Sequence, residues 1–355
     1  MRQHFLLVLS LALLGGGLGF SGSRVLVTPQ GSRAPAWRPQ RAAASAPPMM
    51  NGMAGLARKM KQKSLTPLRE AAGQDGSPVA KALAEKGKFP PETKLLTSLK
   101  KPPRTLSVIA EYRRKSQNCG LIADMLPGKI MSRDFREGGA HAVSVYMDPS
   151  TGGCTEEDFE EIVTEQQSAL GGFPGPAPVI YRDVVVDEVQ LAHARACRAD
   201  AVVLSVGVLG DDLQEMMAAA GEFGLEVVVE AKNEADIERA AATDAPMIAL
   251  AGMSVDDAIA LAPAIPEDRL KIAYVPVYDD KNLIEAEDAW RLRDAGINSV
   301  LASEVLFKFG MGDGEHSISV IKAIRSKGSV KYARASGAYV GKGEGAKEFL
   351  GHLEM

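Results

Sequence analysis

Short apolar runs alternate with longer amphipathic stretches from about residue 105 onward. Each run has four to seven residues and is rich in Val, Ile, Leu and Ala, a pattern that predicts a buried β-strand. The eight runs are Leu106–Tyr112, His141–Met147, Pro178–Val184, Ala201–Val206, Leu225–Ala231, Pro246–Ala251, Leu270–Val275 and Ser299–Ala302.

The stretches between these runs carry apolar residues at helical spacing, most clearly in Glu156–Leu170, Asp211–Phe223 and Lys281–Ala295. Buried strands that alternate with amphipathic helices predict a parallel sheet covered by helices. Eight strand–helix units in about 220 residues fit a (β/α)8 TIM barrel, which typically needs about 250. A doubly wound open sheet is the alternative, although no predicted strand leads into a G-x-G-x-x-G turn. Ala54–Lys86 predicts one or two helices ahead of the barrel.

The N-terminus has the composition of a targeting sequence. Phe5–Leu14 is an apolar core behind Arg2, and the small-residue run Gly15–Gly19 follows it. A core of ten residues is too short to span a bilayer and is typical of a signal peptide. From Phe20 to about residue 69 the chain is rich in Ser, Ala, Pro and Arg and contains no acidic residue, as in organelle transit peptides.

A signal peptide joined to a transit peptide resembles the bipartite presequence of algae with complex plastids. We therefore expect a plastid (chloroplast stroma) protein that is not membrane-bound after processing. The alternative is ordinary secretion with a disordered basic linker. The predicted segments are a signal peptide over 1–19, a transit peptide over 20–50, a helical extension over 51–104, the barrel over 105–327 and a tail over 328–355.

Charge is distributed unevenly along the chain. Ten of the 41 basic residues precede Glu70, whereas all 45 acidic residues lie from Glu70 onward, so the body carries a net charge of −14. Such a body repels a nucleic-acid backbone, and nucleic-acid partners are therefore not expected. The three cysteines are too few and too scattered for a disulfide framework or a zinc site. Cys119 and Cys154 fall in the first two loops after strands, either as a redox pair or as unpaired thiols.

In a barrel of this kind, chemistry takes place where strands end and the following loops begin. Glu111 and Glu230 each lie inside an otherwise apolar strand, and Arg182 ends another. Carboxylates that face an arginine in one barrel mouth would form a polarised pocket. The other polar residues at predicted strand ends are Arg113, Arg114, Asp183, Lys232, Tyr274, Ser303 and Glu304.

Four segments resemble strand motifs of the indole-3-glycerol phosphate synthase family. Val108–Ser116 (VIAEYRRKS) resembles its first-strand A-E-[YIF]-K-x-x-S, and Pro178–Asp183 (PVIYRD) its third-strand P-[VI]-L-x-K-D. Val228–Ala231 (VVEA) resembles the fifth-strand L-[VI]-E-[VI], and Ser299–Leu306 (SVLASEVL) the eighth-strand V-L-V-G-E-S-L. The resemblance runs in order from about residue 105 to 327 and implies the barrel with its preceding helix.

The resemblance also implies the site and the reaction. The family closes an indole ring on a carboxyphenylamino-deoxyribulose phosphate with loss of carbon dioxide and water, and needs no cofactor. The implied catalytic positions are Glu111, Arg113, Arg182 and Glu230, and the implied substrate-binding positions are Ser116, Ser303 and Glu304.

Several positions depart from the family pattern. Both catalytic lysine positions are arginine here, and arginine does not readily release a proton near neutral pH. The sixth-strand asparagine is Ala251, and the seventh-strand E-S-G-I is Tyr274–Val277, where Pro276 lacks a backbone donor.

These departures leave three hypotheses. The first is a plastid barrel that has lost catalysis and has a structural or regulatory binding role. The second is an active, divergent indole-3-glycerol phosphate synthase, a lyase of tryptophan biosynthesis. The third is a phosphosugar-binding barrel with another reaction. We expect a sugar-phosphate ligand, no metal, and a protein partner docked through the tail unless that tail is only a loosely ordered terminus.

Overall fold

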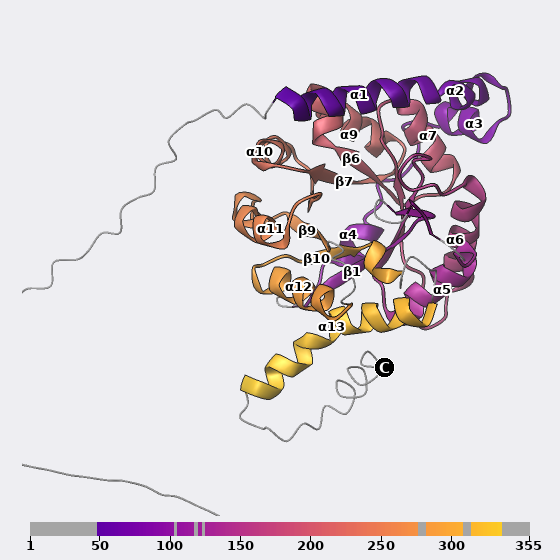
Figure 1. Cartoon of the computed structure of the whole chain (residues 1–355). Helices are drawn as coiled ribbons and strands as arrows, with labels where there is room; N and C mark the ends of the chain where they lie inside the picture. Colours follow the sequence, from indigo (N-terminus) through magenta and orange to yellow (C-terminus); the bar gives the residue numbers. More distant parts are fainter. Residues whose placement is uncertain are drawn as a thin grey trace, which may run out of the picture. The chain divides into compact units, whose positions relative to one another are not determined.

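The eight predicted strands form one closed parallel barrel in the computed structural model, which describes residues 48–102, 105–116, 120–122, 125–275, 282–307 and 314–335 (Figure 1). The strands pair in the order β1-β10-β9-β8-β7-β6-β5-β4, and β1 closes the barrel because it pairs with both β10 and β4. The fold class is therefore confirmed, and the open sheet is excluded. The strands are β1 (Ser107–Tyr112), β4 (Ala142–Tyr146), β5 (Val179–Arg182), β6 (Ala201–Ser205), β7 (Glu226–Ala231), β8 (Met247–Leu250), β9 (Leu270–Val275) and β10 (Ser299–Ala302).

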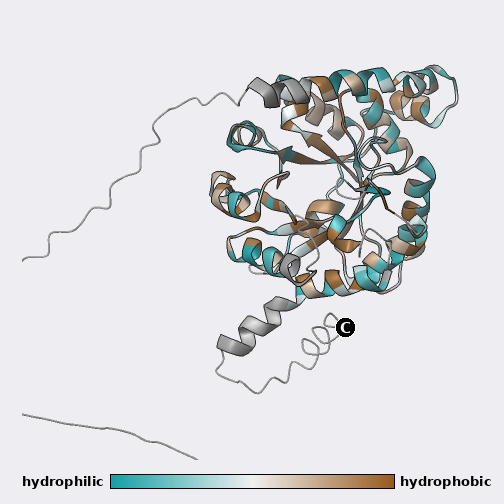
Figure 2. Ribbon diagram, in the orientation of Figure 1, coloured by the Kyte–Doolittle hydropathy of each residue, from teal (hydrophilic) through white to brown (hydrophobic). Residues whose placement is uncertain are grey.

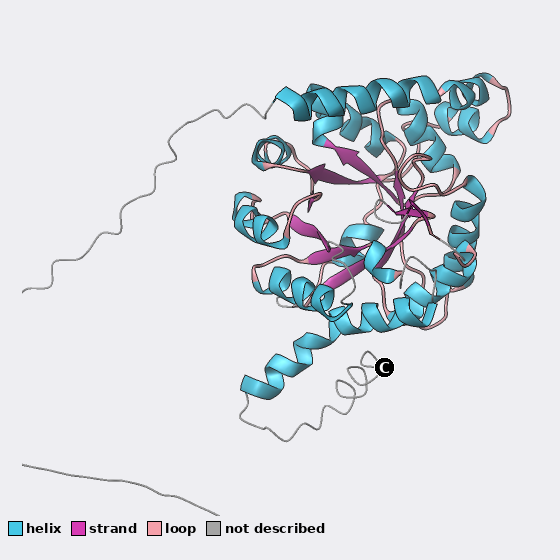
Figure 3. Cartoon of the chain, in the orientation of Figure 1, coloured by secondary structure: helices cyan, strands magenta, loops and turns pink. Residues whose placement is uncertain are grey.

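Helices surround the strands (Figure 3). They are α5 (Gly128–Gly138), α6 (Glu156–Ser168), α7 (Glu188–Ala196), α8 (Val206–Leu209), α9 (Leu213–Glu222), α10 (Glu234–Ala241), α11 (Val255–Leu261), α12 (Asn282–Asp294) and α13 (Gly314–Ala335), with the short 3-10 turns η1 (Gly210–Asp212), η2 (Ala262–Ala264) and η3 (Glu304–Leu306). The three predicted helices correspond to α6, to η1 with α9, and to α12. Residues 328–335 of the expected tail continue α13, and residues 336–355 lie outside the described part.

The chain before the barrel forms more helices than the sequence predicts. Instead of one or two helices over Ala54–Lys86, the structure has α1 (Pro48–Ser64), α2 (Thr66–Gly73) and α3 (Pro78–Ala84). Prolines in the first turns of α2 and α3 explain the breaks, because a proline cannot donate the backbone hydrogen bond that continues a preceding helix. Ser77 caps α3 by accepting a hydrogen bond from the Ala80 backbone N–H at 3.0 Å. Two short antiparallel strands of two residues each, β2 (Lys115–Ser116) and β3 (Gly120–Leu121), follow β1.

A fourth N-terminal helix, α4 (Lys94–Leu99), closes the N-terminal end of the barrel. Its Leu95 and Leu99 are fully buried among strand residues that point into the barrel, such as Ile109 and Ile272. The Glu226 carboxylate at the start of β7 accepts hydrogen bonds from the backbone N–H groups of Leu95 (2.5 Å) and Leu96 (2.9 Å), which the first turn of a helix leaves unpaired. The larger core lies between the strands and the outer helices, and hydrophobic segments run along the strands in Figure 2. With one end of the barrel closed by α4, the polar strand ends lie at the other.

Candidate active site at the barrel mouth

The C-terminal ends of the parallel strands bring the predicted acidic and basic residues together. Glu111 and Glu230 are the last but one residues of β1 and β7, and Arg182 is the last residue of β5. Parallel strands that share a register end on the same side of a barrel, so these side chains converge there. We call this end of the barrel the mouth.

Arg182 occupies the centre of an ionic cluster in the mouth. Its Nη1 donates to Glu111 Oε2 at 2.5 Å, and its Nη2 donates to Glu230 Oε2 at 3.2 Å. The side chains of Arg182, Glu111 and Glu230 are 12%, 0% and 7% exposed. The guanidinium carbon also lies 4.2 Å from the ring centre of Tyr146 and 4.7 Å from that of Tyr274. Arg182 is thus held by two carboxylates and two aromatic rings.

The protonation states in this cluster follow from burial and from its charges. Burial tends to raise the pKa of Glu230, but Arg182, Lys232 and a hydrogen bond from Tyr274 outweigh it, so the pKa is lowered. Burial tends to lower the pKa of Arg182, but Glu111, Tyr274 and Glu230 raise it well above its usual value. Burial raises the pKa of Tyr274 well above 10, which keeps its hydroxyl protonated and donating to Glu230 Oε2 at 2.8 Å. Near neutral pH, Glu230 is therefore an anion that receives hydrogen bonds.

Arg113 forms the second half of the cluster. Its Nη1 donates to Ser303 Oγ at 3.2 Å and lies 3.2 Å from Glu304 Oε1. Its Nη2 donates to the Thr151 backbone carbonyl at 2.9 Å, and its Nε donates to the backbone carbonyl of Lys115. Every N–H-bearing nitrogen of this buried guanidinium therefore has a partner within the protein.

Ser303 joins the two halves, because its Oγ donates to Glu111 Oε1 at 2.5 Å. The structure thus connects six of the seven predicted site residues in one network: Glu111, Arg113, Arg182, Glu230, Ser303 and Glu304. Ser116 lies in β2, and its side chain lies outside the described part of the structure. Pro276 and Cys119 also lie outside it, so the missing backbone donor at Pro276 and the cysteine pair stay predictions.

Three other residues singled out at strand ends have different roles. Arg114 pairs with Asp158 in the first turn of α6, and Asp183 pairs with Lys61 of α1. Lys232, with a half-exposed side chain, lies at the mouth with its Nζ 3.4 Å from Glu230 Oε1. Cys154 is buried with its thiol 3.5 Å from the Tyr112 carbonyl oxygen, and burial raises the pKa of that thiol.

A lysine from the N-terminal helices, which no motif in the sequence predicts, also contacts residues at the strand ends. Lys61 of α1 is only 8% exposed, and its Nζ lies 3.2 Å from Asp148 Oδ1 and is also bonded to Asp183 Oδ1. Asp148 accepts hydrogen bonds from Thr151 N (3.1 Å) and Thr151 Oγ1 (2.8 Å), and so holds the turn whose carbonyl receives Arg113. The only signal in the sequence is that Asp148 directly follows one predicted strand and Asp183 lies near the end of the next. Tyr146, at the end of β4, was also missed.

The described residues contain neither a membrane-spanning helix nor a cluster of metal ligands. None of the helices in the described ranges is long and apolar enough to cross a membrane. Within the same ranges, no three His, Cys, Asp or Glu side chains are grouped so that they could hold a metal ion.

The chain is similar to one family of known proteins. The family model "Indole-3-glycerol phosphate synthase" matches residues 59–309. Curated proteins of that name include one from Nocardioides sp., 31% identical over 216 residues, which covers 59% of this chain and 77% of that protein. Another, from Desulfotalea psychrophila, is 26% identical over 243 residues, covering 67% of this chain and 88% of that protein. The solved structure "Native KDPGal structure" matches with a TM-score of 0.47 and 15% identity, covering 64% of this chain and 97% of that one.

Proposed function

Because the chain belongs to the indole-3-glycerol phosphate synthase family, we propose that it is a paralogue that has lost the synthase reaction and has a structural or regulatory binding role. Ring closure with loss of carbon dioxide and water requires a group that protonates the ketone and a group that helps the hydroxyl leave. Arg113 and Arg182 stand where the family has lysines, and a guanidinium keeps its proton far above neutral pH.

The observation that carries this proposal is the position of Arg182 between Glu111 and Glu230. In the described structure, both nitrogens at the end of Arg182 and all three guanidinium nitrogens of Arg113 are bonded to the protein itself. Two carboxylates that such a synthase would use for proton transfer are instead occupied as counter-ions. A sugar phosphate must compete with these internal bonds, and we therefore propose that it binds weakly.

The location and the partner belong to the same proposal. We infer a plastid protein whose signal and transit segments are removed, and a protein partner that docks through the C-terminal tail. N-terminal sequencing of the protein from its source should give a first residue near position 50, and a protein that starts before Phe20 would refute the targeting proposal.

One observation favours the second candidate function, an active synthase. The Lys232 ammonium lies 3.4 Å from Glu230 Oε1 and is half-exposed at the mouth. There it could donate a proton to the substrate ketone, which an arginine does not readily do near neutral pH. In that case Lys232 would replace the family lysines as general acid.

Two assays separate these functions. We expect residues from about 50 onward not to rescue a tryptophan auxotroph that lacks the synthase, and the purified protein not to turn over the carboxyphenylamino-deoxyribulose phosphate. Turnover of about one per second or faster, as in working enzymes, would overturn the proposal. If turnover is seen, Lys232→Met tests whether this lysine supplies the proton, with Lys129→Met, which alters an exposed lysine on α5, as the control.

Restoring the lysines should not restore synthesis. General acid catalysis contributes roughly 10²–10⁴ in rate, yet Arg113→Lys combined with Arg182→Lys leaves Ala251 where the family has asparagine. We therefore expect little or no activity from the double variant in the same turnover assay. Activity typical of the family in this variant would mean that the two arginines alone had silenced the site.

A further inference from the structure

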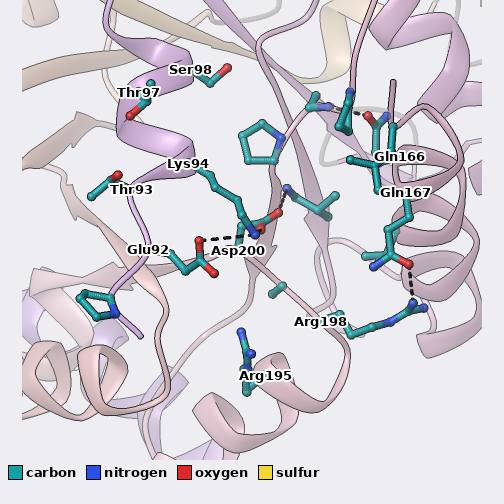
Figure 4. Close-up of a pocket in the computed structure, with 18 residues that line it drawn as sticks. Glu92, Thr93, Lys94, Thr97, Ser98, Gln166, Gln167, Arg195, Arg198 and Asp200 are labelled. Carbon is teal, nitrogen blue, oxygen red and sulfur yellow. Dashed lines mark hydrogen bonds and ion pairs between the residues drawn. The ribbon is translucent and has the colours of Figure 1, made fainter. Parts of the chain in front are cut away.

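A cavity of about 950 Å³ lies at the opposite end of the barrel from the mouth (Figure 4). It opens beside the N-terminal ends of β5 and β6, where Val179 and Asp200 line it, and beneath the segment that leads into α4. Its volume is within the range of cavities that hold small molecules. Nothing in the mouth cluster reaches it, because Arg182 is at the other end of β5.

Most of the charged groups on its walls neutralise one another. Lys94 Nζ lies 3.2 Å from Asp200 Oδ1 and 3.5 Å from Glu92 Oε2. Arg198 donates to Gln167 Oε1 at 2.7 Å and to Glu160 Oε1 at 2.5 Å. These pairs leave no acidic side chain of the wall free of a basic partner.

Arg195 is the exception. It projects from the last turn of α7 and is half-buried, with its guanidinium carbon 4.2 Å from the ring centre of Phe89. Within the described ranges, its side chain forms no ion pair and no hydrogen bond. Figure 4 shows the contrast, because dashed lines reach Lys94 and Arg198 but none reaches Arg195. The cavity therefore has an uncompensated positive charge in its wall.

We propose that this cavity binds a small organic anion, with a carboxylate or phosphate group paired to Arg195. A guanidinium presents several donors in one plane, an arrangement that matches both groups, and contact with the Phe89 ring restrains the guanidinium before a ligand arrives. Hydroxyl groups of Thr93 and Thr97 line the same cavity as further donors, and Leu170 and Pro176 offer apolar surface to the organic part of the ligand. This site does not depend on whether the mouth is catalytic.

Calorimetric titration of the full chain tests the site with three probes. Benzoate and phenyl phosphate carry the two candidate anionic groups on the same ring, and benzamide is the neutral control. We expect saturable binding of at least one anion and none of benzamide, and the tighter of the two anions identifies the preferred group.

Variants locate the binding. Arg195→Met should weaken the affinity at least about tenfold, and Arg195→Lys less, because it keeps the charge and loses the planar set of donors. Arg239→Met is the matched control, since Arg239 is an exposed arginine near the end of another helix, α10, and pairs only with Asp211 in the described structure. The Arg239→Met variant should bind the anion with the same affinity as the unaltered chain.

Two results would overturn the proposal. One is no saturation by either anion up to about 10 mM, a concentration that exceeds the Kd of even a weak complex. The other is an unchanged affinity in Arg195→Met, which would place the anion elsewhere, for instance at the mouth. If Arg195→Met does not fold by circular dichroism, Arg195→Lys decides, because an affinity equal to that of the unaltered chain would then show that the planar set of donors is not used.

Discussion

The two ends of the barrel use an arginine in opposite ways. At the mouth, Arg182 contacts two tyrosine rings and is bonded to Glu111 and Glu230. At the other end, the Arg195 guanidinium also lies over an aromatic ring but forms no ion pair in the described structure, and the two acidic residues that line the cavity there, Glu92 and Asp200, pair with Lys94. The comparison shows that an aromatic contact orients a guanidinium, whereas its acidic neighbours decide whether it stabilises the fold or remains able to bind a ligand.

The largest expected effect concerns stability at the mouth. Arg182→Met leaves the Glu111 and Glu230 carboxylates buried without their shared cation, and breaking a buried pair in this way costs about 3–5 kcal/mol. Urea unfolding at pH 7 measures the difference, and Arg182→Lys, which keeps a positive charge, should lose less. A loss below about 1 kcal/mol would show that Arg182 does not hold the mouth together.

A smaller loss is expected from the tyrosine that contacts Glu230. Tyr274→Phe removes the hydroxyl that donates to Glu230 Oε2, and loss of a hydrogen bond to a buried charged group costs about 1.5–3 kcal/mol. Tyr146→Phe is the matched control, since Tyr146 contacts the same guanidinium and its hydroxyl has no hydrogen bond within the described ranges. Equal losses in the two variants would contradict the role given to the Tyr274 hydroxyl.

The dependence of the Arg182→Met loss on pH tests the protonation of Glu230. The lowered pKa of Glu230 contributes stability that is present above its ordinary pKa of about 4.5 and is lost as the pH falls through the lowered value. Without Arg182, burial shifts this pKa upward, so the variant folds more readily when Glu230 takes up a proton. The difference in unfolding free energy between the two proteins should therefore shrink from pH 7 to pH 4. A difference that grows on acidification would mean that Glu230 is not an anion at neutral pH.

The smallest effect is expected at the opposite end. Arg195→Met removes an arginine that has no carboxylate partner in the described structure, and such a substitution changes stability by about 0.5 kcal/mol or less. Urea unfolding of Arg195→Met and Arg182→Met under the same conditions compares the losses in unfolding free energy at the two ends of the barrel. If Arg195→Met lost as much stability as Arg182→Met, the two arginines would not differ in their contribution to the fold.

The sequence predicts the barrel well because its strands are short, apolar and evenly spaced. Each predicted run contains the strand that the structure shows, and the register of β1, β5 and β7 follows from the fold, so Glu111, Arg182 and Glu230 could be placed together from the sequence. The position of Ser303 between Glu111 and Arg113 depends on side-chain geometry, which no periodicity encodes.

The N-terminal region was the hardest to predict. Helix α4 has only six residues, too few for a helical period to be recognised. Its Leu95 and Leu99 pack against strand residues as far along the chain as Leu301, and local sequence patterns do not reveal such contacts. Lys61 lies in the acid-free stretch that resembles a transit peptide, so its burial between Asp148 and Asp183 could not be anticipated. Composition describes such a segment on average and cannot single out the lysine that turns inward.

The burial of Lys61 bears on the proposed processing of the N-terminus. A peptidase that trims the chain up to the start of α1 at Pro48 leaves the Lys61 contacts in place, but a cut beyond residue 61 removes the ammonium that Asp148 and Asp183 share. The turn that holds the Thr151 carbonyl against Arg113 would then lose part of its support. If the proposed processing takes place, a mature chain that keeps the contacts of Lys61 to Asp148 and Asp183 begins at or before residue 61.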